Sequence, residues 1–199
     1  EIVKQDRCYL VEGYMDVISM HQSGVKNVVA SSGTSLTPGQ IRMIRRFTNN
    51  ITVLYDGDRA GIKASIRGID MLLAEGMNVK VLLLPDGDDP DSFARKHNAK
   101  EYREYIDSHQ TDFIRFKTRL FMEDSADDPV SRASLIDNMV TSIALIPDKI
   151  LRSMYIKECS QTMNVEESLL LDAVAKVKRE KIMERRREEE RTQNAAAAE

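Results

Sequence analysis

The chain has 199 residues, of which 42% are hydrophobic and 31% are charged, so it is long enough for one or two globular domains with a sizeable core. Its formal net charge of −3 excludes a global positive field that recruits nucleic acid. Any such contact needs a local basic patch or another part of the protein. No apolar run reaches the roughly 20 residues of a membrane span, and no signal peptide is visible, so we expect no membrane partner.

The two cysteines, Cys8 and Cys159, lie far apart in the chain and form no CxxC pattern. Such cysteines are typical of free, buried thiols in a reducing compartment, so we expect a cytoplasmic protein. The first residue is Glu1 rather than a methionine, from which we expect the chain to be an excised fragment of a longer protein.

The first half of the chain alternates short apolar runs with helical patterns. Thr37 and Gln40 form a capping box with Pro38 at the first helical position, and a later apolar stripe over residues 62–73 predicts a helix that stops at Gly76. Continuous runs of Val, Ile and Leu are typical of parallel strands covered on both faces. We therefore predict an α/β fold, an open and mainly parallel sheet flanked by helices, with ligands at the carboxyl ends of its strands. The predicted strands are residues 8–11, 27–30, 51–55 and 79–84.

The strand signals disappear after about residue 98, and only helical patterns follow. Asp128, which is followed by a proline, predicts a helix start. Asn164 and Glu167 predict another capping box. Helices are expected near residues 99–108, 111–123, 129–145, 148–161 and 165–190.

These patterns divide the chain into three parts. Residues 1–98 carry the strands and form the first predicted domain, and residues 99–183 form an all-α helical subdomain. Residues 184–199 are highly charged and then rich in alanine, so we expect a disordered tail or a frayed helix there.

Acidic residues follow three of the four predicted strands. In a parallel sheet these strand ends lie at one edge, so carboxylates from separate parts of the chain converge there. Such a group of negative charges repels itself unless a cation neutralises it. Oxygen ligands without histidine or cysteine favour Mg²⁺ or Mn²⁺ over zinc. The residues are Glu12 and Asp16 after the first strand, Asp56 and Asp58 after the third, and Asp86, Asp88, Asp89 and Asp91 after the fourth.

Each acidic cluster also has a structural interpretation as a helix cap. Asp58 can cap the next helix with Gly57 in the turn, and Asp89 can cap a helix that has Pro90 first. Capping explains poorly why aspartates come in pairs two residues apart, so we favour metal binding for the three clusters together. Two metals at such a site stabilise charge in phosphoryl transfer, and Glu12 either organises a metal or moves a proton.

Small and basic residues near the strand ends are weaker candidates for the site. The loop of Ser32, Gly33 and Thr34 either lines the site or only makes a turn. Basic side chains one helical turn apart can contact phosphates of a nucleotide or nucleic acid, although we favour solvated faces paired with acids. Tyr14 and Tyr55 are interpreted as core residues. The basic candidates are Arg59, Lys63 and Arg67, with a second group at Arg42, Arg45 and Arg46.

Four strings in the sequence resemble the Toprim domain of bacterial DnaG-type DNA primase. The signature is one glutamate after the first strand and a DxD after the third, and topoisomerases, small Toprim nucleases and OLD-type nucleases share it. The longer strings point to primase within that group. The helical part from residue 99 resembles, by position and helicity alone, the helical subdomain that follows Toprim in the primase polymerase core. The strings are VEGYMDV (11–17), ASSGTSLT (30–37), VLYDGDRAG (53–61) and LPDGDDPDSF (84–93).

The resemblance implies a DNA-directed RNA polymerase of the primosome, which makes short RNA primers on single-stranded DNA by metal-dependent nucleotidyl transfer. It implies two or more Mg²⁺ or Mn²⁺ ions with bound nucleotide and no zinc in this fragment. The implied partners are the DNA template, nucleoside triphosphates, the RNA primer and the replicative helicase. By position, Glu12, Asp56 and Asp58 match the catalytic and metal-binding acids, Asp89 and Asp91 match an additional acidic metal-binding pair, and Asp16, Gly13 and Gly57 match supporting residues.

The chain departs from the whole family protein in what it lacks. We find no zinc-binding module, no N-terminal half of the polymerase core with its basic template surface, and no recognisable helicase-binding domain. We therefore expect the fragment to bind metal but to make primers weakly or not at all alone. Contact with the helicase is expected through a C-terminal domain outside this chain.

Three other functions compete with primer synthesis. Another Toprim enzyme, a nuclease or a topoisomerase fragment, would cleave phosphodiesters, but the DPD string and the helical continuation count against it. A phosphatase of the haloacid dehalogenase type also places DxD after a strand. It usually has Thr or Val four positions after the nucleophile, where Ala60 stands here, and it leaves Glu12 unexplained. The third is a non-enzymatic module that only binds metal, nucleotide or a regulator.

Overall fold

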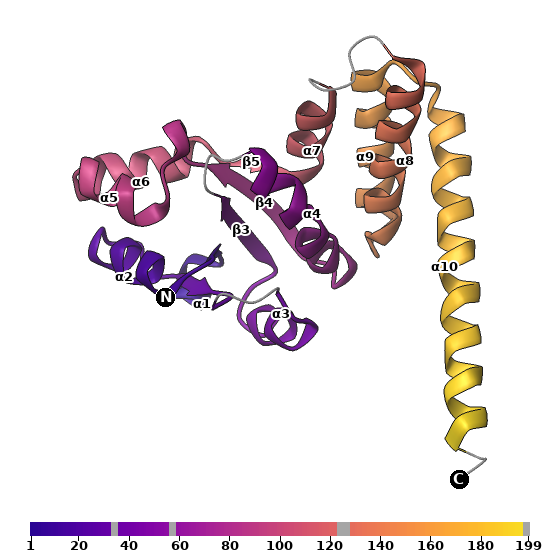
Figure 1. Cartoon of the computed structure of the whole chain (residues 1–199), viewed down its shortest axis with the longest axis horizontal. Coiled ribbons are helices and arrows are strands. Elements are labelled where there is room, and N and C mark those ends of the chain that lie inside the picture. Colours follow the sequence, from indigo (N-terminus) through magenta and orange to yellow (C-terminus); the bar gives the residue numbers. More distant parts are fainter. Residues whose placement is uncertain (33–35, 56–58, 123–127, 197–199) are drawn as a thin grey trace. The chain divides into compact units, whose positions relative to one another are not determined.

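The computed structural model describes residues 1–32, 36–55, 59–122 and 128–196. The chain forms two compact units, Glu1–Phe116 and Lys117–Glu199 (Figure 1). Within the described ranges, no helix combines the length and the apolar character needed to cross a membrane. The domain limits predicted from the sequence stay predictions.

The first unit is built on a five-stranded sheet in the order β2-β1-β3-β4-β5. The first four strands along the chain pair in parallel, as the sequence predicts, and β5 joins antiparallel at one edge. The register sets Tyr9 opposite Thr52 and Val53 opposite Val81, so the carboxyl ends of neighbouring strands lie at the same edge. The strands are β1 (Cys8–Val11), β2 (Val28–Ala30), β3 (Asn50–Tyr55), β4 (Asn78–Leu83) and β5 (Thr111–Asp112).

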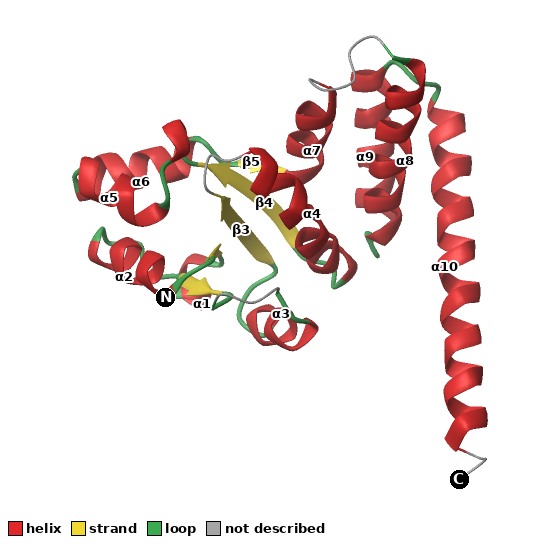
Figure 2. Ribbon diagram, viewed as in Figure 1, coloured by secondary structure: helices red, strands yellow, loops and turns green. Residues whose placement is uncertain are grey.

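Helices cover both faces of this sheet, as its apolar strands require (Figure 2). On one face, Tyr9 and Leu54 of the strands pack in a core with Phe93 of α5. On the other face, Ile41 of α3 and Leu72 of α4 are fully buried. The helices of the first face are α2 (Tyr14–Gln22), α5 (Pro90–Lys96) and α6 (Ala99–Ser108), and those of the second are α3 (Pro38–Arg45) and α4 (Arg59–Ala74), with the short α1 (Ile2–Gln5) before β1.

Local sequence sets where two of these helices begin and end. The Thr37 hydroxyl accepts the Gln40 N–H at 3.3 Å, and the Gln40 side chain accepts the Thr37 N–H at 2.9 Å. Pro38 is the first residue of α3, so the predicted capping box is confirmed. Ile69 of α4 is buried, as the predicted stripe requires, and the chain turns after this helix at Gly76, whose φ of 76° is left-handed.

The chain differs from the sequence prediction between α6 and α7 (Phe113–Met122). Thr111 and Asp112 pair with β4 as the short strand β5, whereas the sequence predicts only helix there. The Asp112 carboxylate then accepts the Ile114 N–H at 2.9 Å, at the start of α7. A two-residue edge strand is too short to show a strand pattern, because its pairing depends on the neighbouring strand rather than on its own side chains.

The second unit is helical, as predicted. Buried Met139, Ile156 and Leu170 come from three helices that pack on one another. The Asp128 carboxylate accepts the Ser131 N–H at 2.8 Å, which confirms the predicted helix start. The helices are α8 (Pro129–Leu145), α9 (Lys149–Met163) and α10 (Glu167–Ala196), and α7 extends from the first unit into the second.

Asn164 ends α9 instead of beginning α10. Its φ of 50° is left-handed, and its N–H bonds to the Ser160 carbonyl. The predicted capping box with Glu167 is therefore wrong, because asparagine also adopts the left-handed conformation that commonly ends a helix. The outer part of α10 is exposed, and Arg185 donates to Glu189 one turn later at 2.9 Å.

Two of the smaller predictions are confirmed and one is wrong. Cys8 and Cys159 are buried and do not form a disulfide, and burial raises the pKa of the Cys8 thiol to about 12. Tyr55 is buried, as predicted. Tyr14, in contrast, is 72% exposed, because α2 buries the opposite side, where Met20 lies.

Candidate functional site

The acidic residues predicted for the site follow strands that are neighbours in the sheet. Glu12 comes after β1 and Asp89 comes after β4, and β3 lies between these two strands. Tyr55, the last residue of β3, ends at the same edge. Asp56 and Asp58, the predicted DxD pair after β3, lie outside the described residues.

The turn that carries Glu12 is held from two sides. The Gly13 N–H donates to the Asp16 carboxylate at 3.0 Å, within the first turn of α2. The Glu12 carbonyl accepts the Ser32 N–H at 3.0 Å, from the loop after β2. A side chain at Gly13 would place its Cβ 3.3 Å from the Asp16 carboxylate, so glycine suits this close approach. Asp16 and Gly13 therefore support the Glu12 backbone.

The Asp16 carboxyl group lies in a negative environment. Its pKa is raised mainly by burial and further by the charges of Asp89 and Glu12. Burial and the Glu12 charge also raise the pKa of Tyr55, and burial with the charges of Asp16 and Asp89 raises the pKa of Tyr102. The structure thus brings Glu12, Asp16 and Asp89 into one electrostatic neighbourhood.

Asp89 and Asp91 lie at the start of α5, and both carboxylates have hydrogen-bond partners. Asp89 caps the helix by accepting the Ser92 N–H at 2.6 Å, as its structural interpretation predicts. Asp91 accepts the Ser19 hydroxyl of α2 at 2.6 Å and forms an ion pair with Arg95. The contact with Ser19, which sequence reasoning missed, joins the helix after Glu12 to the helix that Asp89 caps.

Asp88 is turned away from solvent, with only 8% of its side chain exposed. Its carboxylate accepts the Lys96 ammonium at 2.6 Å and the Ser92 hydroxyl at 2.7 Å. These two donors lower the pKa of Asp88. The spacing of Ser92 and Lys96, one helical turn apart, is the sequence signal that could have indicated these contacts.

The donor set at this edge fits a hard divalent cation. Exposed Glu12, half-buried Asp16 and exposed Asp89 offer carboxylate oxygens, and their shared negative charge is the kind that a bound cation neutralises. Over the described ranges, no three His, Cys, Asp or Glu side chains are grouped closely enough to hold a metal. The catalytic and ligand roles of the predicted acids therefore stay predictions.

The weaker candidates also stay predictions. Ser32 adopts a left-handed φ of 62° beside the Glu12 turn. Arg42 and Arg45 both lie near Glu75, at 3.9 and 3.5 Å, which agrees with a solvated, ion-paired face. Gly33, Thr34 and Gly57 lie outside the described residues, as do the side chains of Arg59, Lys63 and Arg67.

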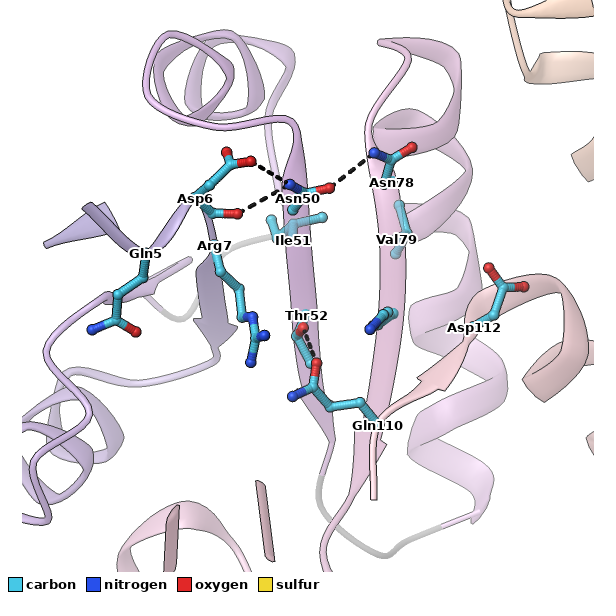
Figure 3. Close-up of a pocket in the computed structure, with 11 residues that line it drawn as sticks. Gln5, Asp6, Arg7, Asn50, Ile51, Thr52, Asn78, Val79, Gln110 and Asp112 are labelled. Atoms are coloured by element: carbon cyan, nitrogen blue, oxygen red, sulfur yellow. Dashed lines mark hydrogen bonds between the residues drawn. The ribbon is translucent and has the colours of Figure 1, made fainter. Parts of the chain in front are cut away.

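A polar pocket of about 240 Å³ lies at the opposite edge of the sheet, at the amino ends of β3 and β4 (Figure 3). Asn50 donates to the Asp6 carboxylate at 3.0 Å and accepts from Asn78 at 2.9 Å. Thr52 donates to Gln110 at 2.9 Å. Because these groups bond to one another, the pocket does not indicate a ligand.

Comparisons with known proteins agree with this arrangement. Residues 9–94 match the Toprim-like family, and residues 115–168 match the DnaB-helicase binding domain of primase. The DNA primase of Halalkalibacterium halodurans is 36% identical over 174 residues, which cover 87% of this chain and 28% of that protein. The chain thus spans less than a third of the length of this relative.

Two solved structures show the same likeness. A DNA primase domain from Pseudomonas aeruginosa is 26% identical with a TM-score of 0.74, over 89% of this chain and 57% of that one. A DnaG primase catalytic domain bound to single-stranded DNA is 32% identical with a TM-score of 0.68, over 80% of this chain and 54% of that one.

One expectation is corrected by these comparisons. The expectation from the sequence was that the helicase-binding domain is missing or not recognisable, yet residues 115–168 match the DnaB-helicase binding domain of primase. This segment is α-helical without a short motif, so position and helicity alone could not identify it. The matches along the chain lead to one conclusion: it belongs to the DnaG-type DNA primases, and it contains their Toprim domain and the helical region that follows.

Proposed function

We propose that this chain is the metal-binding part of a primase catalytic core that makes short RNA primers on single-stranded DNA. The observation that carries the proposal is that Glu12 and Asp16 follow β1 and Asp89 follows β4, at the sheet edge where β3, the strand before the DxD pair, also ends. The relatives named DNA primase and the solved primase domain bound to single-stranded DNA support the same activity.

The residues that would hold Mg²⁺ or Mn²⁺ are Glu12, Asp56, Asp58, Asp89 and Asp91. When bound, two or more such ions supply charge stabilisation at the transferring phosphoryl group and activate the 3′-hydroxyl of the primer. The chain's own contribution in this proposal is to place acidic residues after β1, β3 and β4, whose carboxyl ends lie at one edge of the sheet. Glu12 either orients a metal ligand or accepts a proton.

Asp16 acts in this proposal through the backbone. Its carboxylate accepts the Gly13 N–H, and the Ser32 N–H donates to the Glu12 carbonyl, so the Glu12 side chain extends from a turn whose backbone is held on both sides.

Nucleoside triphosphates, the DNA template and the primer would approach this edge. Because the net charge is −3, binding of the DNA template must depend on a local basic surface or on other parts of the protein. We therefore expect little or no primer synthesis by this chain alone.

Another Toprim enzyme, a nuclease or topoisomerase that cleaves phosphodiesters, is the alternative. The primase relatives and the helical region disfavour it.

We further propose that the helical unit contacts a replicative helicase, because residues 115–168 match the DnaB-helicase binding domain of primase. Ile150 and Met154 of α9 are candidates for that contact, since they are 75% and 65% exposed and lie one helical turn apart.

Replacing both aspartates of the DxD pair, by Asp56→Ala with Asp58→Ala, is expected to weaken Mn²⁺ binding to this chain by on the order of tenfold or more. The reason is that two of the carboxylates that neutralise the cation are lost. Calorimetric titration with Mn²⁺ measures the effect. Glu104→Ala, which removes an exposed acid of α6, is the control and should bind as wild type does. Equal binding by all three proteins would contradict the metal site.

Asp16→Asn is expected to raise the melting temperature of the metal-free chain at pH 7. The folded state raises the pKa of Asp16 above its ordinary 3.8, so ionisation costs stability as pH rises through the folded pKa. Asparagine removes this cost and still accepts the Gly13 N–H. Near pH 3, where Asp16 is protonated in both states, the difference should vanish. Asp137→Asn on the exposed side of α8 is the control, and an unchanged melting temperature at pH 7 would rule out charge crowding at Asp16.

Template-directed incorporation of ribonucleotides, measured beside cleavage of single-stranded DNA, tests the enzyme class. The intact parent protein is expected to make primers and to lose this activity at least ~100-fold in the double DxD variant, since an unneutralised phosphoryl group reacts slowly. The 199-residue chain should incorporate far less than the parent. Primer synthesis by the chain at the parent's rate would refute the expected incompleteness, and DxD-dependent cleavage without synthesis would favour the nuclease alternative.

Binding of the chain to a purified DnaB-type helicase hexamer tests the helical unit. Ile150→Ser with Met154→Ser is expected to weaken binding several-fold, because two apolar side chains leave the interface. Val3→Ser, at a 66% exposed position of the first unit, is the matched control. If the wild-type chain does not bind the helicase, the helical unit has no such role on its own.

A further inference from the structure

The four-residue stretch from Asp88 to Asp91 carries three aspartates, and the first two differ in exposure. Asp88 has 8% of its side chain exposed, whereas Asp89 is exposed at the start of α5. We infer that Asp88 is a positioning residue, which fixes the Asp89 carboxylate for metal binding without binding the metal itself. The inference rests on the proposed metal site.

The first step is that the Asp88 carboxylate is held from one face of α5. Ser92 and Lys96 are one helical turn apart, so both side chains reach the same side. Their hydroxyl and ammonium groups lie 2.7 and 2.6 Å from the same oxygen of Asp88, Oδ1. Hydrogen bonds of this length to an ionised carboxylate are among the stronger ones in proteins, and here they tie the loop after β4 to the helix.

The second step is that the Asp88 carboxylate orients the Ser92 hydroxyl by accepting its hydrogen. A serine hydroxyl has one hydrogen and two acceptor lone pairs. Because its hydrogen goes to Asp88, its lone pairs remain to accept the Asp89 N–H, which lies 3.0 Å away. Without Asp88, the hydrogen could turn to the Asp89 carbonyl, which lies 3.2 Å away. Asp88 therefore maintains the capping box around Asp89.

The third step concerns the Asp89 side chain. Its Oδ1 accepts the Ser92 N–H at 2.6 Å, so the capping box holds this oxygen at the start of α5. The other oxygen is not used by the cap and remains for a ligand. The charge of Asp89 also acts on Asp16 and Tyr102, so the carboxylate lies in the acidic neighbourhood of the proposed site. Positioning of Asp89 thus positions one ligand.

The fourth step is the charge balance. The Lys96 ammonium neutralises Asp88 in a partly buried contact, so Asp88 adds little net charge to the edge where Glu12, Asp16 and Asp89 lie. Asp88 and Lys96 carry opposite charges, so a direct charge effect on a nearby cation would have opposite signs for the two residues. If loss of either residue weakens metal binding, the two act by positioning Asp89, and this can be measured.

Lys96→Met and Asp88→Asn in the 199-residue chain provide the test, with Mn²⁺ titration as the readout. Loss of a positive charge near a cation site by itself strengthens cation binding. If Lys96 positions Asp89 through Asp88, Lys96→Met instead weakens Mn²⁺ binding about tenfold, as loss of a supporting partner typically does. Asp88→Asn should weaken it to a similar degree and leave the number of bound ions unchanged. Lys96→Arg, which keeps the charge and a donor, should restore most of the affinity.

The control pair is Lys100→Met and Glu104→Gln, because these residues form an exposed ion pair on the neighbouring helix α6. Both controls should bind Mn²⁺ as wild type does. Amide exchange at Ser92 should be faster in Asp88→Asn, and the melting temperature of each metal-free variant checks that the fold is kept.

Equal or tighter Mn²⁺ binding by Lys96→Met, or loss of one bound ion in Asp88→Asn, would overturn the positioning role while wild type still binds. Absence of Mn²⁺ binding by wild type would overturn the proposed metal site, and the positioning role with it. The two failures are therefore distinguishable.

Discussion

Parallel pairing of β1, β3 and β4 is the constraint on which the rest of the site depends. It brings three strand ends to one edge, and burial of apolar strands between two layers of helices supplies the stabilisation that holds them there. The electrostatic cost of this pairing lies at the edge itself, where Asp16 is half-buried and its pKa is raised by burial and by the charges of Glu12 and Asp89. The fold thus places negative charges beside one another in an arrangement that a bound cation would relieve.

The same carboxylates serve the fold and the proposed chemistry. Asp89 caps α5, Asp91 joins that helix to α2 through Ser19, and Asp16 closes the first turn of α2. Helix capping and the proposed metal binding are therefore compatible at this edge. A capping carboxylate uses one oxygen for the backbone and keeps another, and the helix holds it in a constant direction.

The sequence allowed the four parallel strands, the start of α3 and the helices of the second unit to be predicted, because each depends on a local pattern. The features that it did not reveal depend on neighbours. Exposure of Tyr14 and the contact of Ser19 are set by which side of α2 faces the sheet and α5, and β5 exists because β4 has an open edge. The acids of the site could be predicted because each follows a predicted strand. The strand order, in which β1 and β4 flank β3, could not be predicted from any sequence motif.

The length of α10 has a consequence for the helical unit. At 1.5 Å per residue its 30 residues span about 45 Å, whereas the 17 residues of α8 span about 25 Å. Beyond its contacts with α8 and α9, the helix is a solvated rod, and its surface carries ion pairs between successive turns such as Arg185 with Glu189. There the helix is stabilised by helix propensity and by ion pairs that salt screens, rather than by packing. Ionic strength would therefore determine how much of the outer part of α10 stays helical.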